Sequence, residues 1–152
     1  MTQAGISVVR KGFGLAWLIF YFAFTLHLAD QVRHDFIGYY NATVLSLYGH
    51  YSWFPRIDIS PRVWLACMGA TAVLWVVLSP FAFKNTRWMR RVATTVAAVQ
   101  FLEGFGVIAA TLRGGTVPSV HFEGVAPGFY TASLVLLASC YLVWSLKVSK
   151  ND

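Results

Sequence analysis

Charged side chains are scarce in this sequence, because Asp, Glu, Lys and Arg together make up only 12% of its 152 residues. Soluble globular domains carry about 25% charged residues, so the composition argues against that class. There are only two cysteines, Cys67 and Cys140. We predict that they lie about 10 Å apart in membrane depth, which excludes a disulfide between them.

The sequence also lacks the short motifs that identify common enzyme classes. It has no phosphate-binding loop, no dinucleotide fingerprint, no Ser–His–Asp order and no haem attachment motif. The net charge of +6 would suit nucleic acid, but the basic residues flank apolar segments and form no basic stripe. We therefore expect no nucleic-acid partner, and expect membrane lipid with anionic headgroups instead.

Long apolar segments dominate the chain, in which 57% of the residues are hydrophobic. Four of them are long enough to cross a hydrocarbon core about 30 Å thick. The predicted spans cover residues 12–29, 63–83, 92–112 and 128–146. The sequence thus predicts an all-α membrane protein, a four-transmembrane-helix bundle that forms a single domain over residues 1–152.

The basic residues predict the orientation of these spans. One set of span ends is flanked by Arg10, Lys11, Lys84, Arg87, Arg90, Arg91, Lys147 and Lys150. The other set has only Arg33, Arg56, Arg62 and Arg113, spread over two longer loops. Because cytoplasmic loops carry an excess of Lys and Arg, we predict that both termini are cytoplasmic.

Residues 36–54 are also apolar, and they raise the alternative of a fifth span. A fifth span would place the basic residues 84–91 outside, against the charge rule. The segment is rich in tyrosine as well. We therefore predict an outer interfacial or re-entrant segment between the first two spans.

Glu103 lies within the third predicted span, where an ionisable group costs about 2.5–3.5 kcal/mol on insertion scales. It shares a helix stripe with Gln100, at spacing i, i+3, so we expect it to face the interior. There it would be protonated, or ionised and paired with a buried histidine or arginine. A catalytic or ligand-binding role, a structural hydrogen bond between helices and a contact with another subunit all remain open.

His27, Asp30 and His34 are spaced i, i+3 and i+7, which puts them on one helix face. Side chains of these types can share a divalent metal such as zinc or iron, although no fixed metal motif is present. They can also form a carboxylate–imidazole pair for proton transfer. A third interpretation is that these residues form a polar helix end whose side chains reach the lipid headgroups.

All four histidines lie on the predicted outer side, together with most carboxylates. The loop over residues 113–127 is shaped by glycines and prolines, so it can fold over the bundle and bring His121 towards His27 or Glu103. The candidate catalytic residues are Glu103, His27, Asp30 and His121. The candidate substrate-binding residues are Gln100, Tyr39, Tyr40 and His50.

Three functions fit this pattern. The first is a small membrane enzyme or binder with an outward-opening polar pocket, acting on a lipid-like apolar molecule by acid–base or metal chemistry. An isomerase, a hydratase and a hydrolase all fit. The second is a non-catalytic subunit of a larger membrane complex. The third is a carrier for protons, metal or a small ligand, which would need to be a homo-oligomer because four spans are few for a monomeric carrier.

Overall fold

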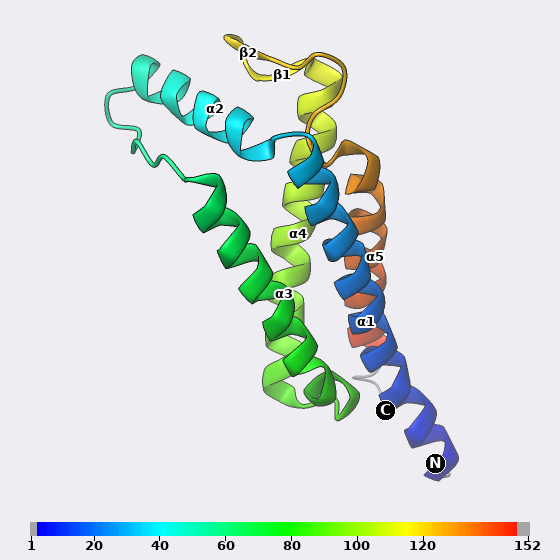
Figure 1. The fold of residues 1–152 in the computed structure, drawn as a ribbon. Coiled ribbons are helices and arrows are strands. Elements are labelled where there is room, and N and C mark those ends of the chain that lie inside the picture. The colour runs from blue at the N-terminus through cyan, green and yellow to red at the C-terminus, as the bar shows by residue number, and fades with distance from the viewer. Residues whose placement is uncertain (1–2, 149–152) are drawn as a thin grey trace.

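The computed structural model describes residues 3–148, with side chains from residue 12 onward (Figure 1). The described elements are α1 (Gln3–Arg33), α2 (Phe36–His50), α3 (Pro61–Phe83), α4 (Arg87–Arg113), β1 (Gly115–Val117), β2 (Val120–His121) and α5 (Phe129–Val148). The side chains of Arg10 and Lys11 and the whole of Lys150, which carry part of the orientation argument, lie outside the described residues.

Four of the described helices are long and apolar enough to cross a membrane. They are Gly12–Arg33, Pro61–Phe83, Arg87–Arg113 and Phe129–Val148. By helix length and composition, these four helices confirm the prediction of a helical, multi-pass membrane protein. The first span continues four residues beyond its predicted end, and the third begins five residues earlier than predicted. The shorter α2, with 15 residues, is not among the four.

Local sequence explains several helix ends. Ser60 caps α3 by accepting a hydrogen bond from the Val63 backbone N–H at 3.2 Å, and Pro61 follows at the first helical position. Gly114 ends α4 in the left-handed conformation, with φ of 73°. Asp35 also has a positive φ, and its carboxylate accepts from the Gly38 N–H at 3.2 Å at the start of α2. The sharp turn at Asp35 separates α2 from α1.

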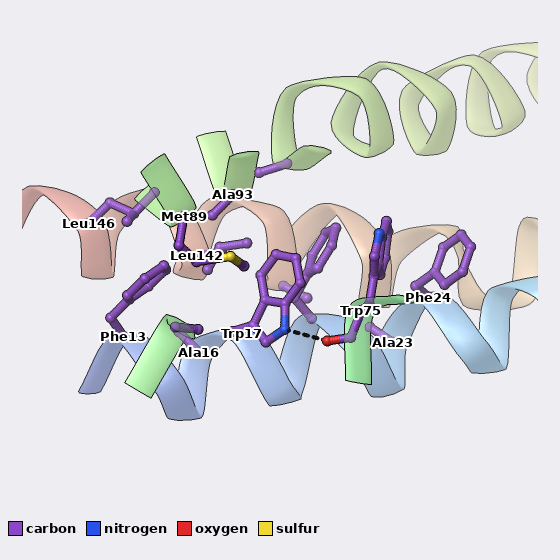
Figure 2. Packing of buried hydrophobic residues seen from close by; sticks show 14 of the residues in the cluster. Phe13, Ala16, Trp17, Ala23, Phe24, Trp75, Met89, Ala93, Leu142 and Leu146 are labelled. Atoms are coloured by element: carbon purple, nitrogen blue, oxygen red, sulfur yellow. Dashed lines mark hydrogen bonds between the residues drawn. The ribbon is translucent and has the colours of Figure 1, made fainter. Parts of the chain in front are cut away.

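Helix α5 packs against both α1 and α4, and α1 also packs against α3. Figure 2 shows the apolar core that joins them, with Phe13 and Trp17 of α1 beside Met89 of α4 and Leu142 of α5. The indole Nε1 of Trp17 donates to the carbonyl oxygen of Trp75 in α3 at 3.1 Å (Figure 2). This contact satisfies the polar end of a fully buried side chain, so it fixes α3 against α1.

The close approach of α4 to α5 depends on Gly104. A Cβ atom added at Gly104 would lie 3.2 Å from the carbonyl oxygen of Ala132 and 3.3 Å from the Leu136 side chain. Small residues at such positions allow membrane helices to come together closely. At Gly106 of the same helix, an added Cβ would meet nothing within 4 Å. One side of α4 is therefore closely packed, and open space remains beside Gly106.

At the end of the molecule away from the N-terminus of α1, α2 runs at a steep angle to the long helices and the β1–β2 hairpin lies beside it (Figure 1). The hydroxyls of Thr43 and Thr116 are hydrogen-bonded to each other, and the Ser46 and Ser119 hydroxyls are 2.5 Å apart. The ring of Tyr39 packs on Phe122 with centroids 4.8 Å apart. These contacts hold α2 and the hairpin together near the end of α4.

Candidate functional site

Glu103 contacts two polar side chains of α1. Its Oε1 atom lies 3.0 Å from Nε2 of His27, and the same oxygen accepts a hydrogen bond from the amide of Gln31. The side chain of His27 is only 1% exposed, while that of Glu103 is 28% exposed. The acid of the third span thus lies against an imidazole of the first span, inside the segments that can cross a membrane.

The other nitrogen of His27 reaches α5. Its Nδ1 atom lies 2.9 Å from the hydroxyl of Thr131, and that hydroxyl donates to Oδ2 of Asp30 at 3.0 Å. A hydroxyl has one proton to donate, so when Thr131 donates it to Asp30, its oxygen accepts the second bond from Nδ1–H of His27. In that arrangement, the Nε2 atom of His27 carries a proton only in the imidazolium form.

Nε2 of His27 and Oε1 of Glu103 therefore attract each other directly only when one of them carries a proton, and the amide of Gln31, which lies 3.2 Å from Nε2 and donates to Oε1, can bridge them when neither does. Two unprotonated acceptors 3.0 Å apart would repel each other. A proton in this contact lies either on the carboxyl, which then donates to a neutral imidazole, or on the imidazole, which then donates to a carboxylate. The two forms differ only by transfer of that proton, so His27 and Glu103 together make an acid–base pair.

Asp30 extends the network to the end of α1. Its Oδ1 atom lies 2.8 Å from Nδ1 of His34, and the His34 side chain is 33% exposed. Asp30 also accepts from the backbone N–H of Thr131 at 3.2 Å. The contacts run without interruption from Glu103 through His27, Thr131 and Asp30 to His34.

Gly128 makes room for this network. Its φ of 88° is a conformation that side-chain-bearing residues rarely adopt, and a Cβ atom there would lie 2.6 Å from Cε1 of His27. The loop before α5 can pass close to the imidazole only because this residue is glycine. Neither Gln31 nor Thr131 was among the candidate residues. Gln31 has a sequence signal, namely its i, i+4 spacing from His27. Thr131 has no such signal.

An apolar pocket of about 230 Å³ lies against Glu103. It is lined by Phe36, Tyr39, Tyr40 and Thr43 of α2, by Glu103, Gly106, Val107 and Ala110 of α4, and by Thr116, Phe122, Ala126 and Pro127. The Oε2 atom of Glu103 is buried and has no hydrogen-bond partner among the described residues. A buried carboxyl oxygen without a partner is costly, so a ligand that donates a hydrogen bond to it would be bound favourably.

Some of the other predicted site residues lie at the pocket beside Glu103, and others lie away from it. Tyr39 and Tyr40 line the pocket beside Glu103. Gln100 does not line it, although its Oε1 atom is also buried without a partner among the described residues. His50 lines a separate hollow between α2 and the hairpin. His121 is exposed in β2 and is not part of the network around His27, because the loop folds as a hairpin and keeps it at the surface.

The contacts of His27, Asp30 and His34 differ from the predicted metal site. Both nitrogens of His27 are engaged by Thr131 and Glu103, and each carboxylate oxygen of Asp30 already has a partner. Within residues 3–148, no group of three or more His, Cys, Asp or Glu side chains is placed to hold a metal ion. The three residues form parts of a hydrogen-bonded chain.

Comparison of the chain with protein-family models, with curated proteins and with solved structures finds no match. The function therefore has to be inferred from the geometry of the site itself.

The bridging role of Thr131 can be tested by replacing it with valine, which has a similar shape but no hydroxyl. We expect Thr131→Val to lower the free energy of unfolding by about 1–3 kcal/mol, because His27 Nδ1–H loses its acceptor and Asp30 loses a donor in a buried site. Thr131→Ser keeps the hydroxyl and should retain most of the stability. The measurement is unfolding in mixed micelles of increasing denaturing detergent. Equal stability of the valine variant and the parent would contradict the assignment.

Proposed function

We propose that the protein is a membrane enzyme that catalyses proton transfer on an apolar small molecule bound beside Glu103. The observation that carries the proposal is the position of Glu103. Its side chain lines an apolar pocket, and one of its oxygens lies 3.0 Å from Nε2 of the buried imidazole of His27. General acid–base catalysis needs such a group within hydrogen-bond reach of the reacting atom.

The surroundings of Glu103 favour this chemistry. The walls of the pocket are mainly aromatic and aliphatic, so electrostatic interactions inside it are stronger than in water. Glu103 would contact the substrate, and His27, which does not line the pocket, would exchange protons with it only through Glu103. Oε2 is covered in the structure, so substrate binding would require a small shift of the pocket wall.

The chain of contacts to His34 supports the same proposal. It links the acid–base pair to a side chain that is 33% exposed, through Thr131 and Asp30. Each member can donate or accept a hydrogen bond, so the chain offers a route by which the pair could exchange protons with water. Among the three reaction types that fit the sequence, isomerisation by proton transfer suits the apolar walls best, since it needs no water in the pocket.

In the proposed arrangement the four long helices form a membrane bundle with both termini in the cytoplasm. Helix α2 would lie in the outer interface over the bundle. It has 15 residues and is therefore about 22 Å long, less than a hydrocarbon core of about 30 Å. Tyr48, Tyr51 and Trp53, at or just after its end, are exposed, as expected of aromatic side chains at headgroup level.

Isotope incorporation tests the proposed chemistry. The purified protein is incubated with an apolar lipid extract in D₂O containing ¹⁸O-labelled water, and the lipids are analysed by mass spectrometry. We expect non-exchangeable deuterium to enter one lipid species. Glu103→Gln should lower the rate by about 100-fold or more, since it removes the general acid–base group. Deuterium alone would indicate an isomerase, deuterium with ¹⁸O a hydratase, and ¹⁸O alone a hydrolase.

Two glycine variants control this experiment. Gly106→Leu should abolish incorporation, because the new side chain enters the pocket from a position where an added Cβ meets nothing within 4 Å. Gly69→Leu adds the same bulk to α3, also where nothing lies within 4 Å of the added Cβ, and should leave the rate unchanged. Absence of both labels with the parent, or an undiminished rate with Glu103→Gln, would contradict the proposed function.

The proposed orientation predicts which loops a membrane-impermeant maleimide can reach. On a background in which the exposed free thiols Cys67 and Cys140 are replaced by alanine, Ser52→Cys should be labelled in intact cells or spheroplasts. Lys84→Cys should be labelled only after lysis. Both positions are exposed, so burial does not distinguish them. Labelling of Lys84→Cys before lysis would show the opposite orientation.

A further inference from the structure

A second hollow adjoins the apolar pocket at the end of α4. Its volume is about 280 Å³, and its lining residues are Arg113, Gly115, Thr116, Val117, Pro118 and His121. Thr116 lines both spaces, and its hydroxyl is hydrogen-bonded to that of Thr43. The two spaces therefore meet at one residue of the hairpin.

The titratable residues that line this second hollow are all basic. Arg113 and His121 can both carry positive charge, and no carboxylate lines it. Arg113 is exposed and makes no ion pair with any residue in the described part of the chain. A guanidinium presents several N–H donors in a planar fork that matches the oxygens of carboxylate and phosphate groups. The hollow thus has the chemistry of an anion site.

One face of α4 connects the two spaces. Gly106, Ala110 and Arg113 follow one another at i, i+4 and i+7, so they lie along the same side of the helix. Arg113 is ten residues from Glu103, which corresponds to about 15 Å along the axis. An elongated molecule lying on this face would meet a cationic group at one end and the acid–base pair at the other.

We propose that the ligand of this site is a lipophilic anion, a long-chain molecule with a single carboxylate or phosphate group. Arg113 and His121 hold its acidic head, and its apolar chain fills the pocket as far as Glu103. The proposal deepens the proposed function, on which it rests, because it names the substrate class for the same pocket. It also gives His121 a role in binding the head of the ligand, at a distance from the chemistry.

Competition for a photoactivatable probe tests this proposal. The probe is a sixteen-carbon fatty acid with a diazirine near its methyl end, crosslinked to the purified protein in nanodiscs. The competitors are palmitate, hexadecyl phosphate and hexadecanol, which have chains of the same length. We expect at least one of the two acids to compete at concentrations about tenfold or more below those of the alcohol. The stronger acid identifies the head as a carboxylate or a phosphate.

Arg113→Gln should remove the preference for the acids over hexadecanol, and Arg113→Lys should retain most of it. Arg62→Gln, a matched change at an exposed arginine at the start of α3, should leave it unchanged. Gly106→Leu should reduce crosslinking itself. Equal competition by the acids and the alcohol in the parent would overturn the proposal. An unchanged preference for the acids in Arg113→Gln would also overturn it, because that result is expected if Arg113 only anchors the helix end among headgroups. Selective crosslinking without isotope incorporation would support the ligand class and contradict the catalytic proposal.

Discussion

The contact between His27 and Glu103 is the interaction on which the rest of the site depends. A carboxyl group inside an apolar helix is stable there only with a partner, and the partner comes from a different helix. The contact joins α1 to α4, and Thr131 adds α5 through the other nitrogen of the same imidazole. One buried histidine, 1% exposed, therefore links three of the four long helices.

Both halves of the molecule have an apolar cluster, but the cluster towards α2 is smaller and lies beside the hydrogen-bonded network. Near the N-terminal part of α1, large apolar side chains such as Trp17 and Phe20 pack against Trp75, and the Trp17 indole makes a polar contact with α3. Towards α2, the helices are joined by hydrogen bonds, and the pocket opens beside them.

Hydropathy and length were enough to predict the four long helices, because both properties can be read from a single segment of the sequence. The pairing of Glu103 with a buried histidine or arginine also followed from the cost of a lone charge, but nothing in the sequence selected His27. The contacts of Gln31 with Glu103 and of Thr131 with His27 and Asp30 span 72 and 101–104 residues of chain, and only the i, i+4 spacing of Gln31 from His27 could be read from the sequence. The position of His121 depended on how the loop folds, and a hairpin keeps that side chain at the surface.

The most direct test of this account is a double-mutant cycle on the unfolding free energy, with His27→Leu and Glu103→Leu made singly and together. If the two side chains stabilise each other across α1 and α4, the double variant is less destabilised than the sum of the single variants. The expected coupling is between about 0.6 kcal/mol, the average measured for polar contacts between membrane helices, and the maximum of about 1.7 kcal/mol. Strictly additive effects would contradict the account.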